Sequence, residues 1–199
     1  MLPLLPPLTL VPPELIAGRY GLVRKLAVGG MAEVWLARQR GLEGFEKLVV
    51  VKRILPHLAN NPEFVQMFLD EARTAADLRH SNVASVTDVG TESGAYFIAM
   101  EYLHGQDLTH VVHRCKVRGE RIPLPHLLQI VSEAAQGLDY AHRKVDRHGE
   151  AQQIIHRDVS PQNVLVTYEG ATKLLDFGIA SASHRTTHTN AGVVKGKFA

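Results

Sequence analysis

The chain has 199 residues, 45% of them hydrophobic and 21% charged, and its 22 basic and 20 acidic side chains give a net charge of +2. This composition is typical of an ordinary globular protein, and without a basic block it gives little support to nucleic-acid binding. The 11 histidines show no zinc-binding spacing. Cys115 is the only cysteine, which excludes an internal disulfide and indicates a reducing, cytoplasmic location.

The first segment, residues 1–18, combines leucines with prolines and carries no charge before Glu14. Its five prolines are Pro3, Pro6, Pro7, Pro12 and Pro13. A signal peptide needs an early basic residue and an unbroken apolar run, and a membrane helix needs about 20 apolar residues. We therefore expect a disordered leader, or an artefact of the chosen start codon, and no membrane segment in this chain.

Two strand-like segments, residues 20–27 and 33–37, flank a turn that reads Val28-Gly29-Gly30-Met31-Ala32. Glycine allows a backbone to approach a ligand closely, so the amides of such a turn can close over phosphate groups. A plain hairpin would have the same pattern. The turn alone does not decide between these interpretations.

Lys52 ends a continuous apolar strand, residues 48–52. A buried lysine needs an anionic partner, whereas a lysine on an edge strand extends to water. We expect the next helix to begin with Asn61 as its N-cap and Pro62 at its first position. The apolar stripe of this helix contains Phe64, Phe68, Ala75 and Leu78. Because Glu71 falls in the middle of that stripe, we expect it to pair with Lys52.

The second half begins with a strand over residues 95–100, and Asp107 follows as a candidate N-cap. A helix is predicted over residues 127–142. The expected buried face of this helix contains Leu127, Ile130, Val131, Ala134, Leu138 and Ala141.

The most informative stretch contains His156-Arg157-Asp158, then Asn163, then Asp176-Phe177-Gly178. Residues 164–175 read as a hairpin, so Asn163 and Asp176 should lie side by side at its open end. Both offer hard oxygen ligands of the kind that magnesium prefers. Asp158 lies on a loop and is free to act as a base. Either motif alone could be an ordinary polar loop, but the hairpin that joins them favours metal-assisted phosphoryl transfer.

With these motifs the chain resembles the eukaryotic-like bacterial protein serine/threonine kinases, from about Tyr20 to its end. The resemblance implies an α+β, protein-kinase-like bilobal fold. Its β-rich N-lobe carries one regulatory helix, and its C-lobe is mainly helical and incomplete. The expected parts are the leader at 1–18, the N-lobe and hinge at 19–103, and a partial C-lobe through the activation segment at 104–199.

The resemblance also implies roles for individual residues. Asp158 would be the catalytic base, Lys52 and Glu71 would position ATP, and Asn163 and Asp176 would hold Mg²⁺. Met100 would be the gatekeeper. The other nucleotide-binding residues would be Ala27, Val28, Gly29, Gly30, Val34, Val50, Glu101, Leu103, Asp107 and Leu165. In the glycine-rich loop only the central glycine of the family pattern, Gly29, is present, because alanines occupy the other two places.

Two further positions depart from the family pattern. Ser160 stands where most members have a lysine, and Lys197 stands where a threonine usually follows the activation-segment glycine. We hypothesise that Lys197 supplies the positive charge missing at Ser160; loss of function at both positions is the alternative. The hydroxyls expected in the activation segment are Ser181, Ser183, Thr186, Thr187 and Thr189. The chain ends before the Ala/Ser-Pro-Glu type motif of the family, so we expect a truncated catalytic domain.

The resemblance predicts an enzyme that transfers the ATP γ-phosphoryl group to Ser or Thr hydroxyls of protein substrates. Self-association for autophosphorylation of the activation segment is a further expectation. One alternative is a truncated, catalytically silent module that binds nucleotides or partners. A kinase for small molecules is a more remote one, because the glycine-containing turn and the hydroxyl-rich segment favour a protein substrate.

Overall fold

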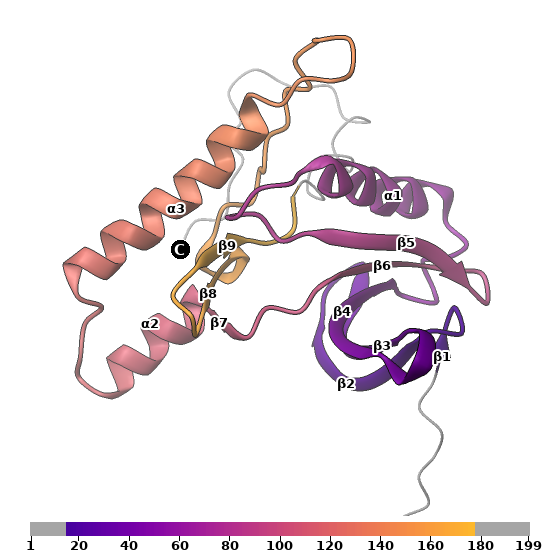
Figure 1. Ribbon diagram of the computed structural model, residues 1–199, viewed down its shortest axis with the longest axis horizontal. Coiled ribbons are helices and arrows are strands. Elements are labelled where there is room, and N and C mark those ends of the chain that lie inside the picture. The colour runs from indigo at the N-terminus through magenta and orange to yellow at the C-terminus, as the bar shows by residue number, and fades with distance from the viewer. Residues whose placement is uncertain (1–14, 178–199) are drawn as a thin grey trace, which may run out of the picture.

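The computed structural model describes residues 15–177, which form two lobes (Figure 1). The first lobe is a six-stranded sheet with the order β1-β2-β3-β4-β6-β5, all antiparallel, and one helix, α1. Its elements are β1 (Leu15–Ile16), β2 (Tyr20–Val28), β3 (Ala32–Arg40), the 3-10 turn η1 (Leu42–Gly44), β4 (Glu46–Ile54), α1 (Pro62–Asp77), β5 (Val86–Glu92) and β6 (Ala95–Glu101).

The second lobe contains two helices and a small antiparallel sheet with the order β7-β8-β9. Its elements are β7 (Gly105–Asp107), α2 (Leu108–Val117), α3 (Leu124–His142), the 3-10 turn η2 (Pro161–Asn163), β8 (Val164–Thr167) and β9 (Thr172–Leu174). In Figure 1 this sheet lies between α3 and the curled sheet of the first lobe. The predicted bilobal α+β fold is confirmed.

Successive residues of a strand point to opposite sides of a sheet. In the first-lobe sheet, residues on both sides are buried in a core. One face encloses a core that includes Tyr20, Val51 and Phe97. The other face packs on α1 through a second core that includes Ile54, Phe68 and Ile98. A strand buried on both sides reads as an uninterrupted apolar run, which explains the sequence of β4.

The N-terminal boundary of the fold differs from the prediction. Residues 1–18 were expected to form a disordered leader, but Leu15–Ile16 pairs with β2 and Ile16 is fully buried in the core beside Tyr20. The backbone N–H of Ala17 also donates a hydrogen bond to Glu92 Oε2 at 3.0 Å. The first lobe therefore includes residues from Leu15 onward, and the rest of the predicted leader lies outside the described residues.

Helix α1 begins as its sequence predicts. Asn61 is the N-cap, and its side chain accepts a hydrogen bond from the backbone N–H of Glu63 at 3.0 Å. Pro62 occupies the first helical position, where its missing N–H leaves no bond unmade. Phe68 and Glu71 lie on the buried face of the helix.

Helix α3 is only partly buried. Ile130, Ala134 and Ala141 belong to the core of the second lobe, together with Leu174 and Phe177. The prediction was wrong for two positions of its apolar face, because Val131 is 57% exposed and Leu127 is 38% exposed. Apolar periodicity shows which side of a helix is apolar but not how much of that side another element covers. No helix within residues 15–177 is both long and apolar enough to cross a bilayer.

The two lobes are joined along β9 as well as through the hinge after β6. The segment before β5 bonds to Leu174 on both sides, since Ala84 N–H donates to Leu174 O and Leu174 N–H donates to Asn82 O, each at 2.9 Å. The side-chain amide of Asn82 adds a bond to Thr172 O at 2.9 Å. These bonds fix the start of β5 on the strand that leads to Asp176.

Candidate functional site

A cleft of about 490 Å³ lies between the two lobes. Val34 and Val50 of the first-lobe sheet form one apolar wall, and Leu165 of β8 lines the second-lobe side. The predicted nucleotide-binding residues that line it are Ala27, Val34, Val50, Lys52, Glu101, Leu103, Asp107 and Leu165, and Asn163, Asp176 and Met100 line it as well. This volume is within the usual range for a small-molecule site.

Three predicted members of the phosphate-binding turn do not line the cleft. Val28, Gly29 and Gly30 are exposed at the tip between β2 and β3. The turn is closed by a hydrogen bond from Gly29 N–H to Ala32 O at 2.8 Å. The predicted hairpin is therefore present at the edge of the cleft.

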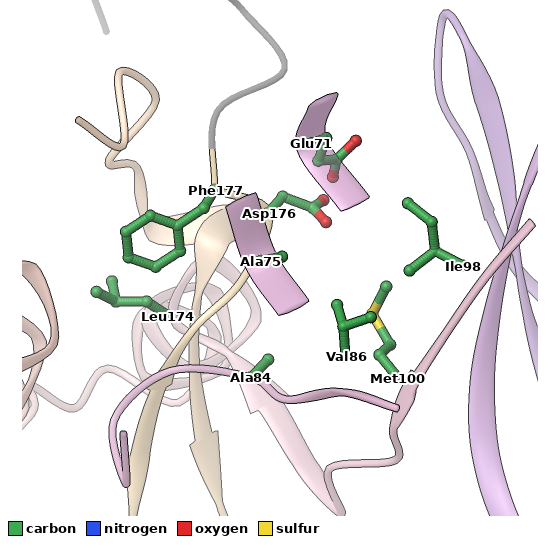
Figure 2. Close-up of a pocket in the computed structure, with 9 residues that line it drawn as sticks. All are labelled: Glu71, Ala75, Ala84, Val86, Ile98, Met100, Leu174, Asp176 and Phe177. Carbon is green, nitrogen blue, oxygen red and sulfur yellow. The ribbon is translucent and has the colours of Figure 1, made fainter. Parts of the chain in front are cut away.

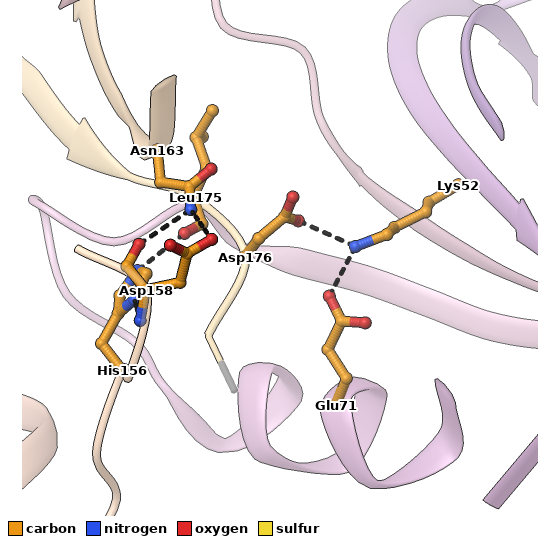
Figure 3. A network of polar contacts seen from close by, with 7 residues as sticks. All are labelled: Lys52, Glu71, His156, Asp158, Asn163, Leu175 and Asp176. Atoms are coloured by element: carbon orange, nitrogen blue, oxygen red, sulfur yellow. Dashed lines mark hydrogen bonds and ion pairs between the residues drawn. The ribbon is translucent and has the colours of Figure 1, made fainter. Parts of the chain in front are cut away.

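Lys52 lies between two carboxylates, as Figure 3 shows. Its ammonium Nζ lies 2.7 Å from Glu71 Oε1 and 3.1 Å from Asp176 Oδ1. Lys52 is 5% exposed and Glu71 is 4% exposed, so the ion pair predicted between the strand and the helix is confirmed. Asp176 is the additional partner that the sequence analysis missed.

The surroundings of this triad shift the ionisation of both buried groups. Burial alone would lower the pKa of Lys52, but the nearby charges of Asp176 and Glu71 outweigh it and raise the pKa. Burial raises the pKa of Glu71 to about 7, against the opposing attraction of Lys52. Lys52 therefore stays a cation at neutral pH while Glu71 lies close to its own titration.

The second cluster in Figure 3 is built around Asp158. The side-chain amide of Asn163 donates to Asp158 O at 2.8 Å and to Asp158 Oδ2 at 3.1 Å. Because both bonds use Nδ2, the Oδ1 oxygen of Asn163 is left to serve as a ligand atom. The hairpin register also matches the prediction, since Leu175 N–H donates to Asn163 O at 2.9 Å and places Asn163 beside the residue before Asp176.

His156 contacts both the Asp158 loop and the residue before Asp176. It is 1% exposed, and its Nε2 lies 2.8 Å from Leu175 O while Asp158 N–H donates to its Nδ1 at 3.3 Å. These contacts fit a neutral ring protonated on Nε2, and burial lowers the pKa of His156 accordingly. His156 thus links the Asp158 loop to the strand that carries Asp176.

The backbone at the end of the hairpin is unusual. Asp176 has φ of 51° and Arg157 has φ of 65°, a left-handed conformation that is uncommon for non-glycine residues and often found at functional sites. Phe177 follows with 2% exposure and packs on the His156 ring at a centroid distance of 4.6 Å. The buried phenyl ring therefore anchors the residue next to Asp176.

Figure 2 shows the residues that line a small cavity, Met100 among them. Ala75 of α1, Ala84 and Val86 contribute small side chains to its lining, and Glu71 and Phe177 also border it. Its free volume of about 20 Å³ has room for a single water molecule. Glu71 Oε2 is buried and has no hydrogen-bond partner among the described residues.

The sequence analysis also missed a set of polar contacts made by the Glu101 side chain next to the hinge. Glu101 was expected to bind the nucleotide, and its side chain has a second role: Oε1 accepts from Lys173 Nζ at 2.8 Å and from Ser85 N–H at 2.7 Å. Lys173 alternates with apolar residues in β9 as any exposed lysine would, so no local signal marks it. Through these two contacts the Glu101 side chain connects the hinge to β9 and to the segment just before β5.

Three remaining predictions have different outcomes. Asp107 is the N-cap of α2, accepting from His110 N–H at 3.0 Å, and it also lines the cleft. Ser160 lies beside Pro161, and its buried Oγ has no partner among the described residues. Lys197 lies outside those residues, as do Gly178 and the hydroxyls at 181–189.

A cleft between a curled sheet and a helical lobe, with a lysine–glutamate pair on one side and an Asp–Asn–Asp set on the other, is the architecture of a phosphoryl-transfer domain. The family model for protein tyrosine and serine/threonine kinases matches residues 21–197. The chain therefore belongs to the protein kinase family.

Among curated relatives, the tyrosine-protein kinase MasK of Myxococcus xanthus is 49% identical over 91% of this chain and 28% of its own length. The serine/threonine-protein kinase PknA of Mycobacterium tuberculosis is 36% identical over 91% of this chain and 40% of its own length. For PrkC of Bacillus subtilis the identity is 35%, over 91% of this chain and 26% of PrkC. The chain thus spans well under half the length of these relatives.

The fold comparison agrees with the family. The M. tuberculosis PknI kinase domain matches with a TM-score of 0.63 and 36% identity, over 81% of this chain and 59% of the PknI chain. Because the match covers 81% of this chain, more than either lobe alone, it includes parts of both lobes.

Proposed function

We propose that this protein transfers the γ-phosphoryl group of ATP to serine or threonine hydroxyls of protein substrates. The observation that supports this most strongly is the pairing of Lys52 with Glu71 and Asp176 at one end of the cleft (Figure 3). In such a site the lysine orients the α- and β-phosphates. The single cysteine and the need for ATP agree with a cytoplasmic setting.

The residues present fit Mg²⁺ carried in on the nucleotide. Asp176 offers carboxylate oxygens and Asn163 offers Oδ1, and both line the cleft. Within residues 15–177, no group of three or more His, Cys, Asp or Glu side chains could hold a metal by itself, which agrees with an ion that takes its other ligands from phosphates and water. When bound, Mg²⁺ would neutralise negative charge on the phosphates, including the charge that the ADP leaving group gains as its bond to the γ-phosphorus breaks.

Asp158 is the proposed base. Its carboxylate would accept the proton of the substrate hydroxyl while the hydroxyl oxygen bonds to the γ-phosphorus and the bond to the β-phosphate oxygen breaks, releasing ADP. The Asn163 amide holds Asp158 from the side, and His156 accepts its backbone N–H. General-base action of this kind contributes about 10²–10⁴-fold.

Ser160 and Lys197 enter the proposal as a pair. The buried Ser160 Oγ, which lacks a partner among residues 15–177, is too short to reach a transferring phosphate as a lysine would. We propose that Lys197 supplies that charge, and a donor of this kind is worth about 2.7–4 kcal/mol in a transition state. If Lys197→Ala phosphorylates its substrate at the wild-type rate, this pairing is wrong.

Tyrosine phosphorylation is the second candidate, because the relative with 49% identity is named a tyrosine-protein kinase. A phosphoamino-acid analysis of a protein substrate and of the protein itself, after incubation with labelled Mg-ATP, distinguishes the two. Phosphoserine or phosphothreonine supports our proposal, and phosphotyrosine alone contradicts it. The same experiment at several protein concentrations tests autophosphorylation between copies, which would give a rate per molecule that rises with concentration.

A silent nucleotide-binding module would bind Mg-ATP without transferring phosphate. Asp158→Asn tests this, with Asp139→Asn as the matched control because Asp139 is an exposed carboxylate of α3 that pairs with the exposed Arg143 four residues later. We expect Asp158→Asn to lose at least about 10²-fold in transfer rate and Asp139→Asn to keep it. Equal rates in both variants would exclude Asp158 as the base.

A further inference from the structure

Glu33 of β3 is a buried carboxylate that the proposed reaction does not use. It is 5% exposed. Its Oε1 accepts from Arg53 Nε at 2.8 Å and from Arg53 Nη2 at 2.6 Å, and its Oε2 lies 2.7 Å from Lys25 Nζ. Lys25 belongs to β2 and Arg53 to β4, so one carboxylate joins three neighbouring strands.

The ionisation of Glu33 agrees with this arrangement. Burial alone would raise the pKa of Glu33, but the hydrogen bonds from Lys25 and Arg53 outweigh it and lower the pKa. Lys25 also lies 4.7 Å from the centre of the Trp35 ring, a cation–π contact that limits where its ammonium can go. The cluster therefore combines a mostly buried, charge-assisted Glu33–Arg53 contact with a more exposed contact to Lys25.

The cluster lies directly behind the residues that face the cleft. In the register of β3 and β4, Val34 pairs with Lys52 and Glu33 pairs with Arg53. Neighbouring residues of a strand point to opposite faces, so β3 and β4 carry Val34 and Lys52 on the cleft side and Glu33 and Arg53 on the other. Arg53 directly follows Lys52 in β4, and Glu33 directly precedes Val34 in β3. A single peptide bond therefore separates each charged residue of the ionic contact from a residue that faces the cleft.

The turn between β2 and β3 begins next to this cluster. Val28 pairs with Glu33 in the β2–β3 register, and the pairing is irregular between Lys25 and Ala27. A second link to β4 comes from Leu55, whose N–H donates to Met31 O at 2.9 Å. The turn and the start of β3 are therefore linked to Arg53 and Leu55, which closely follow Lys52 in the chain.

We propose that Glu33 is a positioning residue that, through Arg53 and Lys25, holds the turn over residues 28–32 at a fixed place relative to Lys52, so that both can bind the phosphates of a nucleotide. Glu33 itself touches no substrate. The inference rests on the proposed nucleotide binding. It predicts that losing the carboxylate weakens contacts to the phosphates and leaves those to the nucleoside unchanged.

Calorimetric titration of the protein with Mg-ATP and, separately, with adenosine tests this proposal. Glu33→Gln is expected to bind Mg-ATP about tenfold more weakly, and adenosine within about twofold of wild type. The matched control is Glu46→Gln, which removes an exposed carboxylate that pairs with Arg38 across the same two strands near their other end. Glu46→Gln should bind both ligands as the wild type does.

Two results would overturn the inference: unchanged Mg-ATP affinity in Glu33→Gln, or an equal loss for adenosine and Mg-ATP, which a purely structural role would give. Lys25→Met serves as a milder variant if Glu33→Gln does not fold, because Lys25 is 44% exposed at its side chain. It should weaken Mg-ATP by about threefold and leave adenosine unchanged. A wild-type protein that binds neither ligand would refute the proposed function itself.

Discussion

Glu71→Gln separates the stability of this site from its nucleotide binding. Removing one partner of a buried ion pair costs about 3–5 kcal/mol when the other charge is left alone. Here Lys52 keeps Asp176 at 3.1 Å. In addition, burial raises the pKa of Glu71 to about 7, so an uncharged glutamine is a smaller perturbation there than at a carboxylate with its ordinary pKa. We therefore expect the free energy of unfolding to fall by only about 1–2 kcal/mol.

The effect on binding should be the larger of the two. Without Glu71, the anionic partner that Lys52 keeps among the described residues is Asp176, and Asp176 is the residue proposed to bind the metal on the nucleotide. A lysine that pairs with a metal ligand is displaced from the phosphates it should contact. We expect Mg-ATP to bind at least about tenfold more weakly, which corresponds to about 1.4 kcal/mol.

Urea unfolding and calorimetric titration with Mg-ATP measure the two quantities on the same samples. Asp70→Asn is the matched control, because Asp70 is the neighbouring carboxylate on α1 and its side chain is 56% exposed. It should bind Mg-ATP as the wild type does. If Glu71→Gln is folded and binds Mg-ATP within twofold of wild type, Glu71 does not position Lys52 and our reasoning is wrong.

The same variant gives a pH test with a defined sign. The pKa of Glu71 rises from 4.5 to about 7 on folding, so the folded state holds its proton more tightly than the unfolded state does. The resulting stabilisation is complete below pH 4.5 and is lost as the pH rises to about 7. Relative to Glu71→Gln, the wild type should lose stability across this window, and parallel pH profiles would contradict the assignment.

Three shorter predictions concern neighbouring positions. Gly137→Ala would place a Cβ 2.8 Å from Asn82 O and 3.0 Å from Leu174 Cδ1, so it should lower the free energy of unfolding, measured with urea, by about 1–3 kcal/mol despite the helix preference for alanine; an unchanged free energy would contradict the packing. Asp176→Asn should remove the dependence of ATP affinity on Mg²⁺, measured by titration with and without EDTA, and a retained dependence would exclude Asp176 as a ligand. His156 has a lowered pKa, so the wild type should lose thermal stability as the pH falls below 6.5, and His156→Asn should not show that fall.

The parts of the fold that the sequence predicted well are those where local pattern and chemistry agree. Asn61 before Pro62 favours a helix start through preferences that are local to the two residues. Glu71 was recognisable because a carboxylate interrupts an apolar helical stripe, and burial of such a group requires a cation. The hairpin after Asn163 followed from a β-branched run, a turn and a return strand, which are signals within a few residues of one another.

The features that the sequence did not predict depend on which surfaces meet in three dimensions. Ile16 follows a proline-rich stretch, and only its contact with Tyr20 shows that it belongs to the core. Val131 has the right periodicity for burial but is 57% exposed, since no described element covers that side of α3. Glu101 and Lys173 are 72 residues apart, and neither has a neighbour in sequence that points to the other.

Glu33 and Glu71 show why one buried carboxylate was predictable and the other was not. In a helix the buried side returns every three to four residues, so a charged residue among apolar ones at that spacing stands out. In a strand every second residue points away from a given face, and a glutamate between Ala32 and Val34 looks like the solvent-facing half of an ordinary alternation. Burial of both faces of the first-lobe sheet removes that distinction. The Glu33–Arg53 contact could therefore be recognised only from the pairing of β3 with β4. In that pairing Glu33 and Arg53 lie on the face of the sheet opposite to Val34 and Lys52.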